Sequence, residues 1–250
     1  MRVYLTLVRR EVSSYFVSLA GYVVIAWVAL LLGVSFSILV GVLSQDPSDM
    51  PITDVFYSTF FFWLILFPVA PVITMRTFAL EKAAGTYETL MTVPVGDLEV
   101  VLAKFTGSMV FYLLTWMPLL GCIYVVHRFS SNPSALDPGP IASTFLGILL
   151  LGMLFMSLGC LASALTRSQI VAAMTSFALC VGLFILSFLS RIIPPDTGWR
   201  TAWLEQFSMT EHMQGFVRGV VDTRYVAYYL SLTVFVLFVT VKVVEIRRWK

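Results

Sequence analysis

Charged residues are spaced very unevenly along this 250-residue chain. Six charge-free stretches reach at least 17 residues, whereas no other gap between charged residues exceeds 8. They are Val12–Gln45, Val55–Met75, Phe105–His127, Pro138–Thr166, Ser168–Ser190 and Tyr225–Val241. A helix needs about 20 apolar residues to cross the hydrocarbon core of a bilayer. The pattern predicts an all-α integral membrane protein with six transmembrane helices, at about 20–43, 55–75, 104–126, 141–165, 169–189 and 225–244.

Composition agrees with this pattern. The chain is 59% hydrophobic and 12% charged, with a mean hydropathy of +0.91, whereas a soluble domain carries roughly 25% charged residues. The basic residues that precede the first apolar stretch resemble a signal peptide, but that stretch is too long for one, so we expect a retained helix. We interpret residues 1–250 as a single transmembrane domain.

The distribution of basic residues predicts the orientation. With the N-terminus inside, the cytoplasmic segments hold eleven of the sixteen Lys and Arg residues, including every lysine. Cytoplasmic loops of membrane proteins are enriched in these residues. We therefore expect both termini in the cytoplasm.

Two segments outside the spans have amphipathic patterns. Residues 1–18 place Val3, Leu7 and Val12 beside Arg9, Arg10 and Glu11, which favours an interfacial helix on the inner leaflet, with a short solvated tail as the alternative. In the outer segment 192–222, Trp199, Trp203, Phe207, Met213, Phe216, Val217 and Val220 can share one helical face. One or two short helices are expected to dip there into the outer membrane interface.

Small residues recur at four-residue spacing in the fourth and fifth helices. The pairs are Gly159 with Ser163, Ala172 with Ser176, and Ala178 with Gly182. Such pairs let helices approach closely in lipid, although small residues are also common in membrane helices generally.

The sequence lacks residues and motifs that several classes of function require. The six charge-free stretches contain no Asp, Glu, Lys or Arg, and ion-coupled carriers need ionisable groups in the membrane. No lysine follows a glycine, so the phosphate-binding loop of an ATPase is missing. No H-E-x-x-H or paired-cysteine motif offers a metal site. We expect no enzyme activity, no cofactor, no metal and no nucleic-acid partner.

The charged loop between the second and third spans, residues 76–103, stands out. Its first part contains helix formers, a break at Gly85-Thr86 and a second short helix that Pro94 ends. Thr86 can cap the second helix, and Glu88 suits its first turn. Taken by itself, the loop is a short amphipathic knob or an ordinary solvated loop.

The stretch "MRTFALEKAAGTYETLMTVPV…LAKF" resembles the cytoplasmic loop of ABC-2-type permeases. The family pattern is roughly M-R-x-F-[AS]-x-E-[KR]-x-x-G-T-x-E-x-L-x-T-x-P-[VI], followed by a lysine that opens the third helix. The matching residues are Arg76, Phe78, Glu81, Lys82, Gly85, Thr86, Glu88, Leu90, Thr92, Pro94 and Lys104. Family members often carry two consecutive acids here, whereas Leu80 precedes Glu81 in this chain.

The likeness extends over the whole chain, and within the family it is greatest to the gliding-motility-type and nitrous-oxide-reductase-maturation-type permeases. It implies the fold of a type V exporter-like permease in a bacterial cytoplasmic (inner) membrane. Such permeases work as homo- or heterodimers with two cytosolic ATPase subunits, which bind the ATP, and the loop is the coupling helix that the ATPase moves. The resemblance implies that Thr86, Tyr87, Glu88 and Leu90 contact the ATPase, that Gly85 permits the break, and that Arg76 and Glu81 orient the loop.

Two other functions stay open at this point. A membrane anchor or scaffold of a gliding- or secretion-type machine would bind the ATPase but move no solute. An ion channel or carrier would conduct ions without any partner, and the charge-free spans make it the weakest reading. The substrate and the direction of transport are not specified by the sequence, although apolar helices suit a lipid-like or amphipathic cargo.

Overall fold

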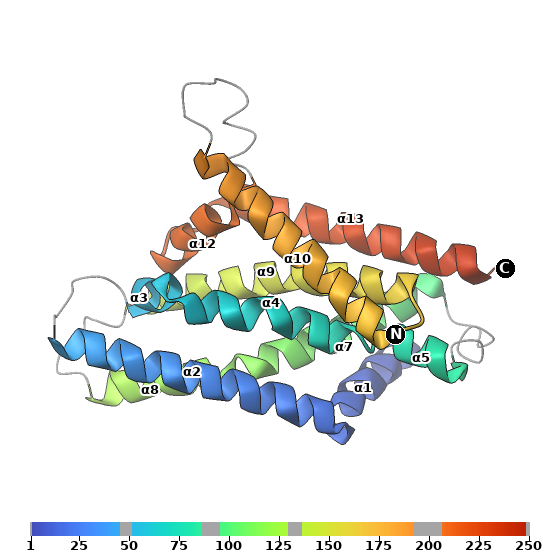
Figure 1. The fold of residues 1–250 in the computed structure, drawn as a ribbon, viewed down its shortest axis with the longest axis horizontal. Helices are drawn as coiled ribbons and strands as arrows, with labels where there is room; N and C mark the ends of the chain where they lie inside the picture. The colour runs from blue at the N-terminus through green and yellow to red at the C-terminus, as the bar shows by residue number, and fades with distance from the viewer. Residues whose placement is uncertain (1, 46–51, 87–95, 130–136, 193–206, 249–250) are drawn as a thin grey trace.

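The structure is a computed structural model that describes residues 2–45, 52–86, 96–129, 137–192 and 207–248. These residues form helices joined by short turns, with no strand among them (Figure 1). The helices are α1 (Arg2–Val17), α2 (Leu19–Gln45), α3 (Ile52–Ser58), α4 (Phe60–Thr74), α5 (Ala79–Ala84), α7 (Asp97–Thr115), α8 (Met117–Phe129), α9 (Pro138–Leu165), α10 (Gln169–Ile192), α12 (Met209–Val217) and α13 (Thr223–Arg248).

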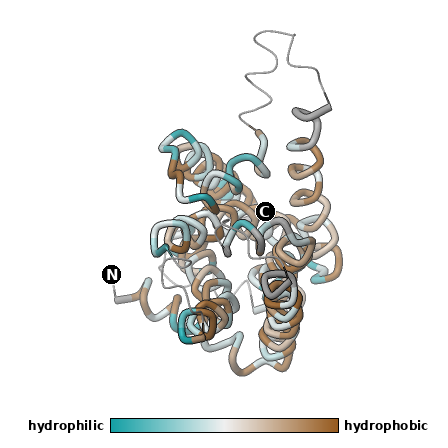
Figure 2. The backbone as a smooth tube through the Cα atoms, turned by 90° about the vertical axis from the view of Figure 1, so that its left-hand side faces the viewer, coloured by the Kyte–Doolittle hydropathy of each residue, from teal (hydrophilic) through white to brown (hydrophobic). Residues whose placement is uncertain are grey.

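Six helical stretches in the described part of the chain are long and apolar enough to cross a membrane. They are Leu19–Gly41, Phe60–Ala84, Asp97–Phe129, Pro138–Leu165, Gln169–Ser187 and Thr223–Ile246. The predicted all-α membrane fold with six spans is confirmed. Seen from one end, the tubes are coloured mostly hydrophobic, with hydrophilic positions in short stretches (Figure 2).

The two ends of the bundle carry different elements (Figure 1). We call the end with α5, both termini and the α9–α10 turn the loop end. The opposite end, with α3 and the start of α9, is the far end.

The third span differs from its prediction. Its helix begins at Asp97, seven residues before the expected start at 104, and so shortens the loop predicted at 76–103. Asp97 and Glu99 lie in the first turn, where acids suit the helix dipole. Lys104 therefore lies within the span, which corrects the expectation that the spans are free of charge.

The second and third spans are each interrupted once. Thr59 separates α3 from α4, with its hydroxyl donating to the carbonyl of Phe56 at 2.6 Å. Trp116 separates α7 from α8, two residues before Pro118. Proline has no N–H to donate and its ring opposes the carbonyl four residues earlier, so a regular helix cannot continue through this point. By contrast, α4 runs through Pro68 and Pro71 to Thr74.

Helix α9 lies at the centre of the bundle and packs against α4, α7, α10, α12 and α13 (Figure 1). Its glycines allow these close approaches. A Cβ on Gly152 would overlap the ring of Tyr112, and one on Gly159 would overlap the side chain of Thr74. The predicted role of Gly159 in close packing is confirmed.

The pairs in α10 divide into two classes. Ala172 and Ser176 are buried, whereas Ala178 and Gly182 face outward. A Cβ on Gly182 would meet no heavy atom of the described chain within 4 Å. The prediction of close packing at Ala178 and Gly182 is therefore wrong within this single chain.

Helix α12 belongs to the predicted outer segment, of which residues 193–206, including Trp199 and Trp203, lie outside the described residues. Its apolar face is seated on α9 and α3 rather than in lipid. Met213, Phe216 and Val217 are buried as the shared face predicted, but Val220 is exposed. Gly147 on α9 makes room for this seat, because a Cβ there would lie 2.8 Å from the Met213 sulfur.

Candidate functional site

The short helix α5 follows α4 at the loop end of the second span. Backbone N–H groups of Met75 and Thr77 donate to Pro71 at 2.9 Å and to Thr74 at 3.1 Å, turning the chain out of α4. Helix α5 is six residues long and ends at Ala84. Gly85, the next residue, adopts a left-handed φ of 73°, which glycine accommodates without strain. The break expected at Gly85 therefore lies at that residue.

Ser163 of α9 holds the start of α5. Its hydroxyl oxygen accepts from the backbone N–H of Phe78 at 3.1 Å and of Ala79 at 3.0 Å. The same hydroxyl donates to the carbonyl of Met75 at 3.2 Å. First-turn N–H groups of a helix have no partner within the helix, so a side chain 84 residues away serves as the cap.

Lys82 makes the second link between α5 and α9. Its ammonium group donates to the carbonyl of Ala164, in the last turn of α9, and lies 6.0 Å from the centre of the Phe78 ring. The last carbonyls of a helix have no partner within the helix, and a cation is favoured there. Two polar contacts thus fix α5 on the end of α9.

A cluster of charges links α5 to α1 and α7. Lys104 Nζ lies 2.9 Å from Glu81 Oε1 and 2.8 Å from Glu11 Oε1. Arg10 Nη2 lies 3.3 Å from the same Glu81 oxygen. The Lys104 side chain is only 3% exposed, whereas that of Arg10 is 59% exposed. The cluster therefore has a desolvated centre and a solvated edge.

Arg76 occupies the corner between the second span and α1. It is half-buried and donates to the hydroxyl of Ser18, where α1 gives way to α2. Nearby, the Tyr15 hydroxyl donates to the carbonyl of Ile73 at 3.3 Å. Burial, with a smaller contribution from the Glu11 charge, raises the pKa of Tyr15 well above its usual value, so its phenol stays protonated as a donor.

These groups line a cavity of about 360 Å³. Its wall carries the charges of Arg10, Glu11, Arg76, Glu81 and Lys104, together with hydroxyl groups. The arrangement is a rigid helical projection on a charged base.

The model of the "ABC-2 family transporter protein" matches residues 40–193, more than half of the chain. This chain belongs to the ABC-2 transporter family. No curated protein matches the sequence. The match includes α5, α7 and α9, which build the base of the site, whereas α1 precedes it.

Membership of the ABC-2 family makes this chain a membrane component of a transporter and not itself a catalyst. Within the described ranges, no group of three His, Cys, Asp or Glu side chains could hold a metal ion. Buried His212 instead stacks on Tyr225, with 4.0 Å between ring centres, and its Nδ1 lies 3.3 Å from the Tyr229 hydroxyl.

The predicted coupling residues of this ABC-2 chain divide into two sets. The first set lies in α5 or next to it and consists of Arg76, Glu81, Lys82, Gly85 and Thr86. The Thr86 hydroxyl donates to the Glu81 carbonyl at 3.4 Å. The second set lies outside the described residues, as does the second short helix. It consists of Tyr87, Glu88, Leu90 and Pro94.

Sequence reasoning missed two parts of the site, Glu11 and Ser163. Glu11 follows two arginines in an amphipathic stretch and carries no signal of its own. Ser163 was noted only as a small residue of a helix pair. Lys104 was part of the family motif, but nothing in the motif indicated that it is buried between two acids.

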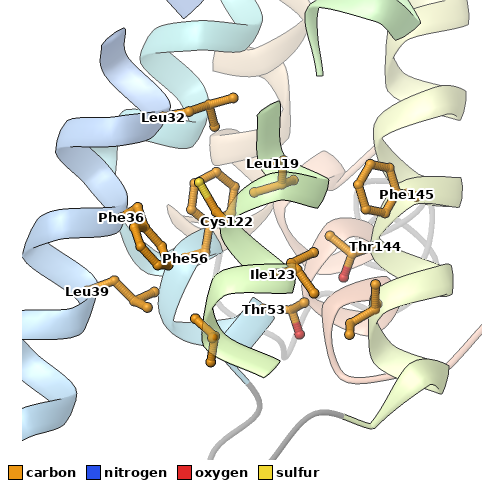
Figure 3. A pocket seen from close by; sticks show the side chains of 12 residues that line it. Leu32, Phe36, Leu39, Thr53, Phe56, Leu119, Cys122, Ile123, Thr144 and Phe145 are labelled. Atoms are coloured by element: carbon orange, nitrogen blue, oxygen red, sulfur yellow. The ribbon is translucent and has the colours of Figure 1, made fainter. Parts of the chain in front are cut away.

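The ABC-2 chain has two apolar hollows away from α5. One of about 700 Å³ lies between α4 and α10, with Trp63, Phe67 and Phe184 along its wall and Thr210 and Gln214 of α12 at one end. The other, of about 40 Å³, is lined by side chains of α2, α3, α8 and α9, among them Phe36, Phe56, Cys122 and Phe145 (Figure 3). The small one has the size of a packing void and cannot hold a cargo molecule.

Proposed function

We propose that this chain is the permease subunit of an ABC transporter and that a separate cytosolic ATPase drives it by pushing on the loop that begins with α5. One observation carries the proposal. Helix α5 is fixed to α9, α1 and α7 by polar contacts, while Ala83, Ala84, Gly85 and Thr86 at its end are exposed. A projection that is fixed at its base and exposed at its end suits a part that receives force.

The charges support a cytoplasmic position for the loop end. Arg9, Arg10, Lys82, Arg167 and Lys242 lie on elements that meet there (Figure 1). Such an enrichment is typical of the cytoplasmic side of a membrane protein. In this orientation both termini lie inside the cell, and α3 and α12 face outward.

Individual residues then have distinct roles. Arg76, Glu81 and Lys82 hold the base of the loop, and Gly85 allows the chain to turn. Thr86, Tyr87, Glu88 and Leu90 would contact the ATPase, with Pro94 ending the second short helix. ATP would bind to the partner and not to this chain. Movement of the loop would shift the packing of the spans between inward- and outward-facing arrangements.

The aromatic hollow between α4 and α10 is our candidate for the cargo path. Its volume of about 700 Å³ is that of a typical small-molecule site. Its wall is apolar apart from groups at one end, and it contains no charged side chain among the lining residues. This chemistry favours a lipid-like or amphipathic cargo over an ion.

The remaining parts of the proposal rest on the family resemblance. They are a homo- or heterodimer of permease subunits in a bacterial inner membrane, within the gliding-motility-type or nitrous-oxide-reductase-maturation-type branch. An anchor or scaffold for a surface machine would use the same α5 contact but not the aromatic hollow. Replacing Phe184 by Glu in that hollow should abolish ATP-driven cargo movement if the chain transports.

Photocrosslinking tests the contact directly. The full chain is co-expressed with a candidate partner, a cytosolic ATPase that carries a P-loop, with benzoylphenylalanine placed at Ala84 or, as a control, at exposed Glu211 of α12. We expect the ATPase to crosslink at position 84 and not at 211. An assembled complex without a crosslink at position 84 would contradict the proposal.

A second test separates binding from coupling. Reversal of the charge in Glu88→Lys should leave the chain in the membrane and abolish ATP-driven transport. Unchanged transport in this variant would remove Glu88 from the interface.

A further inference from the structure

Lys104 is an unusual residue for a membrane helix because its charge is almost fully buried. It lies seven residues after the start of α7, and its side chain is 3% exposed. A buried charge is costly unless it is paired and hydrogen-bonded. Lys104 meets this requirement with two carboxylates, Glu11 at 2.8 Å and Glu81 at 2.9 Å. Its ammonium group also lies 5.4 Å from the centre of the Phe78 ring.

The two acids belong to elements that are far apart in sequence. Glu11 lies in α1 and Glu81 in α5, and each is mostly buried, with 13% and 12% of its side chain exposed. Arg10 adds a second positive charge at the solvated edge, so the four charges balance. Lys104 is the one member that contacts both acids from a third element, α7.

Helix α1 is docked on α7 rather than lying free on a lipid surface. Gly107 permits the crossing, since a Cβ there would lie 2.7 Å from the Glu11 Cβ. Tyr4 and Thr106 share a hydrogen bond of 2.7 Å between their hydroxyl groups. The Tyr15 ring stacks on Phe111 with 4.7 Å between ring centres. The predicted helix is therefore present and packs on α7, while Val3, Leu5 and Val17 remain exposed.

We propose that Lys104 is a positioning residue that locks α1, α5 and α7 into one mechanical unit. Displacement of the loop is then transferred to α1 and to the start of the third span together. The source of that displacement rests on the proposed function, but the lock itself is a property of this chain alone.

The charge arrangement predicts a specific pattern of loosening. In Lys104→Met, Glu11 and Glu81 lose their shared cation and repel each other, so α1 and α5 should both loosen. Glu11→Gln leaves Lys104 paired with Glu81 and should loosen α1 alone. Glu81→Gln should loosen α5 alone. Combining Lys104→Glu with Glu11→Lys restores an opposite-charge pair with α1 but leaves two acids facing each other at α5.

Hydrogen exchange of the full chain in lipid nanodiscs measures these changes. In Lys104→Met we expect exchange to rise about tenfold both in residues 3–17 and in residues 79–86, because local opening controls these rates. Lys242→Met is the matched control, since Lys242 lies at the loop end, is 53% exposed and pairs with Glu245 at 2.7 Å. It should change neither segment.

The double variant distinguishes the lock from a general structural role. Protection should return in residues 3–17 and stay low in residues 79–86. Equal recovery in both segments, or loosening of only one segment in Lys104→Met, would overturn the proposal. If Lys104→Met does not fold, the two glutamine variants decide: loosening of the same segments in both would contradict it.

A complex with the ATPase separates this inference from the proposed function. With vanadate-trapped ATPase bound, exchange should change in α1 and α5 together in the unaltered chain, and in α5 alone in Glu11→Gln. An ATPase that binds without contact to α5 would refute the proposed function and leave the nanodisc result standing. A contact at α5 with the same response in both chains would refute the lock.

Discussion

Two short helices lie at opposite ends of the bundle, and they differ in how much buried apolar surface adds to their polar contacts. In α12 six of the nine residues are buried, whereas in α5 only Ala79 of six is buried. Helix α12 is seated on α9 and α3 through Met213, Phe216 and Val217. Helix α5 depends on a hydroxyl cap, a lysine–carbonyl contact and a charge cluster.

The difference indicates how each end can move. An apolar seat is non-directional and is lost as a whole when the helix lifts. The polar contacts of α5 are few, so only a small number of contacts have to change when α5 is displaced. Regions with few buried apolar contacts also open at lower free energy than the core. The loop end is therefore the better place for a partner to act.

The strongest test of the comparison is Phe216→Ala in α12. Phe216 is 1% exposed, and removing a buried phenylalanine side chain costs roughly 3–5 kcal/mol. Hydrogen exchange in residues 209–217 should rise sharply while that in residues 79–86 is unchanged. Glu211→Ala, on the exposed face of α12, is the control. Equal loosening by both variants would show that the apolar seat does not hold α12.

Gly147→Ala tests the same seat from the α9 side. The new Cβ would lie 2.8 Å from the Met213 sulfur and 3.2 Å from the Phe216 Cβ. Met213 can move aside, but Phe216 cannot move easily, so overpacking should cost about 1–3 kcal/mol. Thermal denaturation in detergent should show a lower midpoint. Gly182→Ala, with open space around it, should leave the midpoint unchanged or raise it.

Lys82→Met tests the contacts that α5 makes outside the charge cluster. It removes the donor to the Ala164 carbonyl and the cation beside the Phe78 ring. The expected cost is about 1 kcal/mol, because the net value of such contacts is modest. Exchange in residues 79–86 should rise severalfold and that in α12 should not. A change in α12 as large as in α5 would mean that the two ends are not independent.

Arg10→Ala should have the smallest effect. Arg10 is 59% exposed, so its pair with Glu81 is screened by water and contributes roughly 0.2–1 kcal/mol. At about 1 M salt, where the screening length is near 3 Å, the difference from the unaltered chain should vanish. A difference that persists at high salt would place Arg10 in the desolvated centre of the cluster.

The sequence predicted the spans well because each is a long charge-free stretch, and hydrocarbon tolerates little else. It misplaced the start of the third span for the same reason. The prediction placed Lys104 at the boundary between the loop and the third span. In the structure its ammonium group lies inside α7 and pairs with two carboxylates. A rule based on charge alone cannot distinguish a solvated lysine from a paired one.

The site was predictable only in part. Gly85 and the helix formers before it have local signatures, and both the break and α5 lie where those signatures indicate. The contacts of Glu11 and Ser163 depend on residues 93 and 84 positions away. No local pattern contains such pairings, because they arise from how the helices pack. The apolar seat of α12 was mistaken for a membrane-facing surface because protein and lipid favour the same side chains.

The interruption at Trp116 divides the third span into two helices, α7 and α8, that can change their relative orientation. From Lys104, α7 continues for about three turns before the break at Trp116. At this break Pro118 has no N–H to donate, so a rotation of α7 need not be passed on to α8. Beyond the break, α8 bears on α2. The half of the span near the loop can therefore rotate while the distant half keeps its contact with α2.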